Sequence, residues 1–147
     1  MRLKRDTIIG PDGSPYMRRW VLEARWCTVR LHHILREDYD CTTFHDHPWD
    51  FVSVLLKGAY SERRPGGDLT YRGAVGFFGA VPFGRRLVAF RPAEALHRIT
   101  WVPKGGAWTL VFTGPRRRQW GFVDQDAWVC WRAWVKAKHG SVKAAYA

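Results

Sequence analysis

The sequence predicts a single-domain, all-β jelly roll that ends in a short C-terminal helix. Short apolar runs recur along the chain, Gly and Pro clusters separate them, and helical periodicity is confined to the last part of the sequence. Many short strands broken by turn residues are typical of a sandwich or barrel. The 147 residues suit one domain, which we take as residues 1–147.

Apolar runs predict eight strands, and turn residues such as Lys57-Gly58 and Gly114-Pro115 lie between them. The predicted strands are Arg19–Ala24, Cys27–Leu35, Trp49–Leu56, Ala59–Glu62, Arg86–Phe90, His97–Val102, Trp108–Thr113 and Trp120–Val123. Together they make a complete small jelly roll plausible, with its core over about residues 27–123.

The segment from residue 126 to residue 139 departs from the β pattern. Trp128, Trp131 and Trp134 recur at three-residue spacing, Asp126 stands where an N-cap is expected, and Gly140 follows the last periodic residue. The pattern predicts a helix over 126–139 whose aromatic stripe is buried.

Two predicted strands contain runs, residues 52–56 and 108–112, that are apolar on both faces. A strand with one face in water would alternate apolar and polar residues. Both faces must therefore be covered, one by the interior and the other by a terminal segment or a second subunit. This pattern predicts a homodimer.

Almost all of the net charge of +11 comes from the two ends of the chain. Residues 1–36 hold eight basic and three acidic residues, and residues 115–147 hold seven and two. A basic surface attracts polyanions, so nucleic acid gripped by Arg116-Arg117-Arg118 is an alternative partner. It is not the favoured one, because no nucleic-acid-binding fold is recognisable in the sequence.

The sequence predicts a cytoplasmic protein with no membrane segment. No stretch approaches the roughly 18 apolar residues of a membrane-spanning helix. Asp6 and Gly10 stand where a signal peptide would have its apolar region. The three widely spaced cysteines, Cys27, Cys41 and Cys130, favour free thiols over a disulfide framework.

The strongest chemical signal is the pair of histidines in Phe44-His45-Asp46-His47-Pro48. Alternate residues of a strand share one face, so His45 and His47 point the same way. His97 lies fifty residues after His47, at the start of another apolar strand, and offers a third imidazole. Imidazole nitrogen suits zinc, copper, iron and nickel.

These residues resemble the two motifs of the cupin family, whose fold is a jelly roll. His45 and His47 match the histidines of the first motif and Gly58 its closing glycine, while Pro92 and His97 stand at the separation of the second motif. The resemblance covers about residues 39–101 through its motifs. The sequence departs from the family pattern at Tyr39, Phe51, Arg86, Glu94 and Trp101.

Phe51 stands where many cupins carry a metal-binding glutamate. The resemblance therefore implies a divalent metal ion held by His45, His47 and His97 alone, similar to the iron(II) site of thiol dioxygenases. Iron(II) is favoured, and zinc, nickel and manganese are alternatives. A ligand set without a carboxylate leaves the ion its full charge, which favours a small anionic substrate.

Other residues are candidates for assisting this site. Asp50, Glu94 and His33 are candidates for orienting an imidazole or carrying a proton. Because His32 and His33 are adjacent on a strand, one of them must face inward, as a ligand, a proton shuttle or a core residue. The residues predicted to contact the substrate are Arg63, Arg91, Tyr60 and Trp101.

The leading hypothesis is a metal-dependent enzyme that acts on a small anionic molecule, with an iron(II) dioxygenase favoured. One alternative is a cupin that binds a metal and a ligand without turnover, as a sensor or regulator. A zinc-dependent isomerase or hydrolase is another. One barrel hosts many unrelated functions, so the fold alone does not choose among them.

Overall fold

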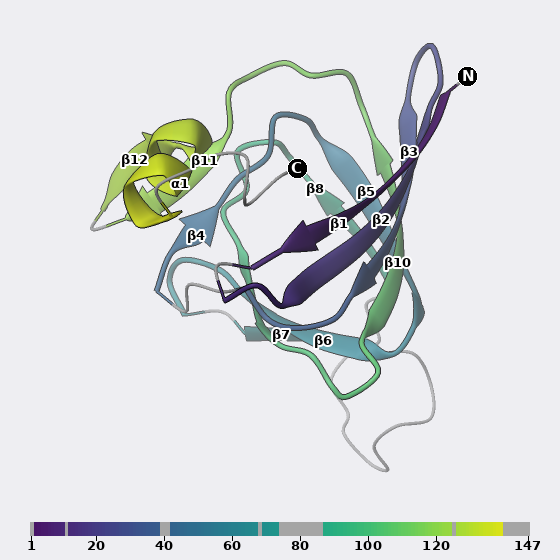
Figure 1. Ribbon diagram of the computed structural model, residues 1–147, viewed down its shortest axis with the longest axis horizontal. Helices are drawn as coiled ribbons and strands as arrows, with labels where there is room; N and C mark the ends of the chain where they lie inside the picture. Colours follow the sequence, from purple (N-terminus) through teal and green to yellow (C-terminus); the bar gives the residue numbers. More distant parts are fainter. Residues whose placement is uncertain are drawn as a thin grey trace.

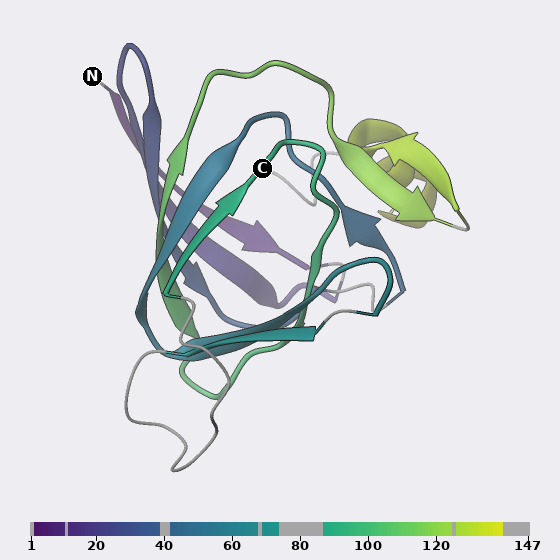
Figure 2. The same ribbon diagram turned by 180° about the vertical axis from the view of Figure 1, so that it is seen from behind.

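A computed structural model describes residues 2–10, 12–38, 42–67, 69–73, 87–124 and 126–139, which form curved sheets around a common interior (Figures 1 and 2). The elements in these ranges are β1 (Arg2–Ile9), β2 (Pro15–Glu23), β3 (Thr28–Ile34), β4 (Phe44–His45), β5 (Phe51–Lys57), β6 (Ala59–Arg63), β7 (Leu69–Gly73), β8 (Val88–Arg91), β9 (Arg98–Trp101), β10 (Ala107–Thr113), β11 (Gly121–Asp124), β12 (Ala127–Cys130) and α1 (Trp131–His139). The prediction of an all-β jelly roll with a short C-terminal helix is confirmed.

Three antiparallel sheets surround the interior. The large sheet has the strand order β1-β2-β3-β10-β5-β8, and the two smaller sheets have the orders β12-β11-β4 and β7-β6-β9. In Figure 1 the large sheet forms one side, β6 and β7 cross the bottom, and β4 lies with β11, β12 and α1 on the opposite side. Strand β10 pairs with β3 and β5, so segments distant in sequence become neighbours.

The helix begins later than the sequence predicts. Residues Ala127–Cys130 form strand β12, which pairs with β11, and α1 begins at Trp131. Asp126, expected as the helix N-cap, has a φ of 64° and lies in the turn between these two strands. Trp128 and Val129 favour a strand because aromatic and β-branched side chains fit a pleated surface.

The structure also adds strands β1, β4 and β7, which are absent from the predicted set. Four residues singled out in the sequence lie outside the described ranges: Tyr39, Cys41, Arg86 and Gly140. Within the described ranges, no helix has the length and apolar character needed to cross a membrane.

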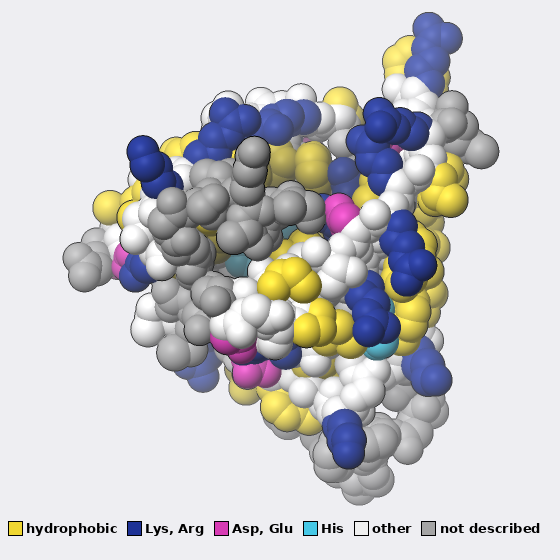
Figure 3. All heavy atoms as spheres, viewed as in Figure 1, with side chains coloured by type: hydrophobic (Ala, Val, Ile, Leu, Met, Phe, Trp, Pro, Cys, Tyr) yellow, Lys and Arg dark blue, Asp and Glu magenta, His cyan; other side chains and the backbone are white. Residues whose placement is uncertain are grey.

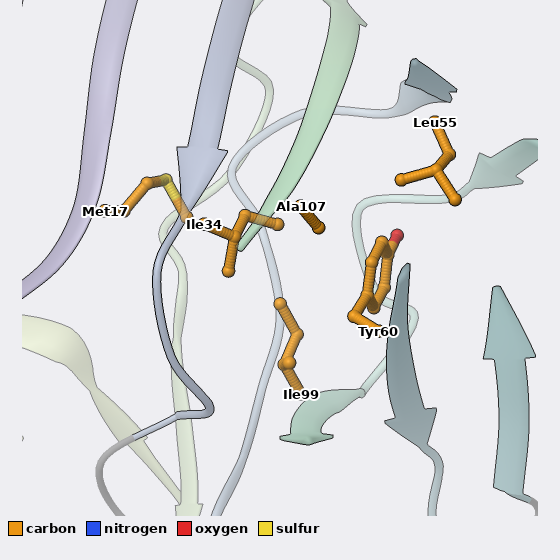
Figure 4. Close-up of a cluster of buried hydrophobic side chains, with 6 residues drawn as sticks. All are labelled: Met17, Ile34, Leu55, Tyr60, Ile99 and Ala107. Carbon is orange, nitrogen blue, oxygen red and sulfur yellow. The ribbon is translucent and has the colours of Figure 1, made fainter. Parts of the chain in front are cut away.

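A cluster of buried side chains joins the large sheet to the β6–β9 sheet (Figure 4). Its members are Met17, Ile34, Leu55, Tyr60, Ile99 and Ala107. Tyr60 carries the one hydroxyl of this group, and the buried guanidinium of Arg72 donates a hydrogen bond to it. Burial raises the pKa of the Tyr60 phenol, so it stays neutral and serves as part of the packed wall.

Gly58 stands at the tight connection between β5 and β6. Its φ is +80°, and a Cβ at this position would lie 2.3 Å from the carbonyl oxygen of Gly106. Both the backbone conformation and the lack of space require glycine. This explains in physical terms why the residue matches the closing glycine of the motif.

We expect Gly58→Ala to lower the free energy of unfolding by at least about 2 kcal/mol, because it adds a backbone clash to the strain of a left-handed conformation. Gly13→Ala is the matched control: Gly13 has a φ of +78° and nothing within 4 Å of a Cβ. The control bears the strain alone, about 1 kcal/mol. Urea denaturation measures both losses, and equal losses would contradict the steric explanation.

Candidate metal centre

Three histidines converge on the interior between the large sheet and β4. One ring nitrogen from each of His45, His47 and His97 lies within 4.8 Å of the others. The Nε2 atoms of His47 and His97 are 2.8 Å apart, and the rings of His45 and His97 have centroids 4.6 Å apart. The structure thus brings together the three imidazoles that the sequence predicts as ligands.

Backbone hydrogen bonds bring these distant residues together. The N–H groups of His45 and His97 each donate to the carbonyl oxygen of the other residue, both at 3.0 Å. The N–H of His47 donates to the carbonyl oxygen of Ala93 at 2.9 Å. The β4 segment is therefore fixed against the segment that precedes β9, and the side chains follow from the backbone pairing.

Asp46, between the two histidines, points away from them and anchors the segment from the other side. The residue is 2% exposed. It accepts hydrogen bonds from the Gly121 N–H at 2.7 Å, the Trp128 Nε1 at 2.9 Å and the Arg118 guanidinium at 2.5 Å. A buried carboxylate with three donors is strongly held, so the orientation of His45 and His47 is fixed from behind.

The histidines face a cavity of about 420 Å³. This volume is in the range of small-molecule sites. Its lining is largely apolar and aromatic, and includes Trp49, Phe51, Ile99, Trp120 and Phe122. The site is therefore a largely apolar pocket in which the three histidines are polar groups.

Burial keeps two of these imidazoles neutral. Desolvation lowers the pKa of His45 to about 4, although the nearby carboxylate of Asp38 opposes it. Desolvation and the neighbouring imidazoles lower the pKa of His47 well below its usual value. A neutral imidazole is the form that binds a metal ion, so both rings are ready to bind at neutral pH.

Comparison with solved structures shows what this chain is similar to. A cupin-2 domain protein from Rhodospirillum rubrum aligns with a TM-score of 0.54 and 13% identity, over 80% of this chain and 73% of the other. A mannose-6-phosphate isomerase-like protein from Ralstonia eutropha JMP134 aligns with a TM-score of 0.52 and 15% identity, over 74% of this chain and 91% of the other. Iron(II) HppE aligns with a TM-score of 0.54 and 12% identity, over 78% and 57%.

The chain has the cupin fold. No protein-family model and no curated protein matches the sequence, so the similarity is one of structure. Its three-histidine cluster is consistent with the metal site of a cupin and suggests that a divalent metal ion binds there.

Phe51 occupies the wall beside the histidine cluster. It is 9% exposed. Its ring meets the ring of His47 edge to face, with centroids 4.8 Å apart. An apolar ring here offers no fourth ligand and keeps water away from one side of the imidazoles.

Two carboxylates lie behind the histidines of the cluster. The Glu62 Oε1 is 3.6 Å from the Nδ1 of His97, and the Asp38 Oδ2 is 3.5 Å from the Nδ1 of His45. A carboxylate near Nδ1 favours the tautomer with the proton on that nitrogen. The Nε2 lone pairs of both rings are then left to face the cavity.

Both carboxylates are themselves held in place. Arg91 donates two hydrogen bonds to Glu62 Oε1, at 3.0 and 2.6 Å. Asp38 accepts hydrogen bonds from the Tyr16 hydroxyl and from the Ile99 N–H. Burial works to raise the pKa of Glu62, but the nearby His97 ring and the charge and hydrogen bonds of Arg91 outweigh it and hold the pKa at about 2.

The donor set fits a metal ion. If Nδ1 carries the proton in His97, its Nε2 presents a lone pair to the Nε2 of His47 only 2.8 Å away. Two such nitrogens repel each other unless a proton or a cation lies between them. Two ligand nitrogens about 2.1 Å from one ion and at right angles would lie about 3 Å apart, close to the observed separation.

The other residues predicted to assist the site do not reach the histidine cluster. Asp50 accepts a hydrogen bond from the Ala93 N–H at 2.7 Å, and Asp50 and Glu94 both pair with Arg117 at the surface. His33 points outward and stacks on Trp108, with ring centroids 4.2 Å apart. Its neighbour His32 is the one that lines the cavity.

Only some of the residues predicted to contact the substrate line the cavity. Tyr60 lines the cavity. Arg91 is buried, but its guanidinium is committed to Glu62. Arg63 and Trp101 are exposed and do not line the cavity, because both lie outside its wall on β6 and β9.

Sequence reasoning missed Glu62 and Asp38. A signal existed for Glu62, since it stands two residues after Tyr60 and alternate strand residues share a face. Asp38 follows strand β3, and nothing in the sequence marks it.

We expect Glu62→Gln to weaken metal binding about 10–100-fold, because the neutral amide no longer favours the Nδ1 proton of His97. Glu94→Gln is the matched control, an exposed carboxylate paired with Arg117, and should change the dissociation constant by less than about twofold. Metal titration gives the constants, and ¹⁵N NMR of the His97 ring reports its tautomer. Unchanged affinity and tautomer in Glu62→Gln would contradict the assigned role.

Proposed function

We propose that this cupin is a metal-dependent enzyme that acts on a small anionic molecule, and that it is an iron(II) dioxygenase-like oxidoreductase. The observation that carries the proposal is the convergence of His45, His47 and His97 on one cavity with Phe51 beside them. The proposed ligands are three imidazoles without a carboxylate.

The ligand set supports an anionic substrate. Three neutral imidazoles leave the charge of a divalent ion uncompensated, so a negatively charged group is attracted to the open coordination positions. When bound, iron(II) would supply the redox chemistry that activates dioxygen. The chain itself contributes an apolar enclosure, through Phe51 and Phe122, and a fixed orientation of the imidazoles, through Asp38 and Glu62.

The structural neighbours support metal chemistry on this scaffold without choosing the reaction. HppE was solved in an iron(II) form. The protein from Ralstonia eutropha is named for isomerisation of a phosphosugar. An experiment must therefore distinguish a dioxygenase from two alternatives. These are zinc-dependent isomerisation or hydrolysis, and ligand binding without turnover.

We expect the untagged protein, reconstituted with iron(II) under anaerobic conditions, to bind about one iron per chain, as a three-histidine site predicts. His47→Gln should lower the affinity at least about 100-fold, because it removes a direct ligand. His33→Gln is the matched control, since His33 lies outside the cavity on Trp108, and should bind like wild type. Elemental analysis measures the metal, and an oxygen electrode screens small thiols and organic acids.

Oxygen uptake that requires both iron and one of these substrates would support the dioxygenase. Retention of zinc with no oxygen uptake would contradict it and direct the search to hydrolysis and isomerisation. Equal metal content in wild type and His47→Gln would contradict the metal site itself.

A further inference from the structure

A second polar group lines the cavity on the inner face of the large sheet. Arg30 and His32 are alternate residues of β3, so both side chains point to the same side. In the neighbouring strand β10, Thr109 pairs with His32, and Thr113 lies on the same face as Thr109. All four residues line the cavity that contains the three ligand histidines.

Arg30 carries a charge that no carboxylate matches. Among the described residues, no carboxylate oxygen lies within ion-pair distance of its guanidinium, whereas Asp6 accepts two hydrogen bonds from Arg19, at 2.8 and 2.6 Å. Arg30 donates to the Thr113 hydroxyl, and its guanidinium carbon lies 4.2 Å from the ring centroid of Trp49. Arg30 is partly buried and has Glu23 and Asp6 in its electrostatic surroundings, but its guanidinium forms no direct ion pair with them and can therefore bind an anion.

The Trp49 ring covers one side of the Arg30 guanidinium. A guanidinium whose face lies against an aromatic ring keeps its N–H groups free in its own plane. That fork matches the two oxygens of a carboxylate or the oxygens of a phosphate. Desolvation lowers the pKa of Arg30 only to about 10, so it is charged at neutral pH.

His32 adds a polar atom without a partner. Its Nε2 is buried and has no hydrogen-bond partner among the described residues. Burial, with the charges of Arg19 and Arg30, lowers the pKa of His32 to about 3, so the ring is neutral. A neutral imidazole carries one N–H, and an N–H on Nε2 would be satisfied by an oxygen atom placed beside Arg30.

We propose that Arg30 and His32 form an oxyanion subsite that binds a carboxylate or phosphate group of the substrate. The proposal rests on the proposed function because it assumes that the rest of the substrate extends toward a metal ion at the three histidines. Thr113 pairs with Phe51, whose ring contacts His47. The Arg30 subsite and the histidine cluster are thus about one or two strand spacings apart, roughly 5–10 Å. This separation limits the substrate to a small molecule.

The test titrates metal-free protein with inorganic phosphate and, separately, with acetate, at constant ionic strength set with chloride. NMR signals of the Arg30 side-chain N–H and the Trp49 indole N–H report binding. Arg30→Met should raise the dissociation constant at least tenfold. Arg18→Met, which removes an exposed arginine from the neighbouring strand β2, should leave it within twofold.

Binding of either probe that depends on Arg30 supports the subsite, and the probe that binds more tightly identifies the oxyanion. No binding of either probe, or the same constant in wild type and Arg30→Met, would overturn it. If Arg30→Met fails to fold, Arg30→Lys replaces it and should still weaken binding because the planar fork is lost. Metal content is expected to be unchanged in these variants, so loss of the subsite and loss of the metal site are distinguishable.

The outer face of the large sheet carries a second, independent inference. Its cross-strand pairs align apolar side chains in two rows that run across the strands. One row consists of Leu3, Leu22, Val29, Phe112, Val52 and Phe90, and the adjacent row consists of Trp20, Leu31, Leu110, Val54 and Val88. Several of these side chains are largely exposed, with Phe90 at 60% and Val88 at 59%.

The size and charge of this face suit association with an identical face. Six strands about 4.8 Å apart and about seven residues long span roughly 600–700 Å², close to the roughly 800 Å² per partner of a standard interface. The charged residues Arg5 and Arg18 lie on β1 and β2, at one edge of the sheet. The outward residues of β5 and β10 are uncharged, and the charged Lys57 comes only at the end of β5. Figure 3 shows hydrophobic side chains beside Lys and Arg side chains on the flank formed by β1–β3.

We infer that a second copy of this chain covers this face, sheet against sheet, in a symmetric dimer. The same apolar rows would then serve both partners, as a two-fold interface requires. Two sheets packed in this way lie about 10 Å apart and interleave their side chains.

Analytical ultracentrifugation at micromolar concentration should give twice the 17.1 kDa mass of the chain. The double substitution Phe90→Glu and Phe112→Glu should give the mass of one chain, while Leu69→Glu, an exposed leucine 59% accessible on β7, should leave the dimer intact. A wild-type mass of 17.1 kDa would overturn the inference and assign the face to another occupant. A dimer that persists in the double variant would overturn it as well.

Discussion

The candidate site depends on the backbone pairing between His45 and His97. Their reciprocal hydrogen bonds are the contact that ties β4 to the segment before β9. Without this pairing, the segment with His45 and His47 would not be held beside the segment with His97. Asp46 reinforces the pairing from behind, because its carboxylate ties the same segment to β11 and β12. The imidazoles are therefore placed by backbone geometry and a buried anchor before any metal ion binds, which is how a preorganised site is built.

The electrostatics of the cavity follow from this placement. At one pole, Asp38 and Glu62 lie behind the rings of His45 and His97 and direct their free lone pairs inward. At the other pole, Arg30 presents positive charge from the large sheet. Apolar walls separate the two poles and strengthen both interactions, since charges act over longer distances where water is excluded. A small molecule that enters such a cavity is oriented as well as bound.

The sequence predicted the parts of this arrangement that depend on spacing. The separation of His45, His47 and His97, together with Gly58, was sufficient for the fold and for the convergence of the three rings. The carboxylates behind the histidines were harder to predict, because a carboxylate that contacts the far side of a ring has no fixed sequence separation from that histidine; alternation with Tyr60 places Glu62 only on the inner face of its strand. Asp38 and Glu62 reach the rings from two different segments.

The choice of arginine shows a second limit of sequence reasoning. Arg91 lies near His97 in the sequence and was the natural candidate, yet its inward position beside Glu62 turns it into a support for that carboxylate. Arg30 was overlooked because Val29 and Leu31 alternate with Arg30 and His32 along β3, a pattern that normally indicates that the polar face is in water. In the structure the inner face of β3 carries Arg30 and His32, while Leu31 contributes to the outer apolar row. One strand thus places Arg30 at the cavity with one set of alternate residues and contributes to the outer apolar rows with the other. Substitutions one position apart on β3 should consequently affect different properties of the protein.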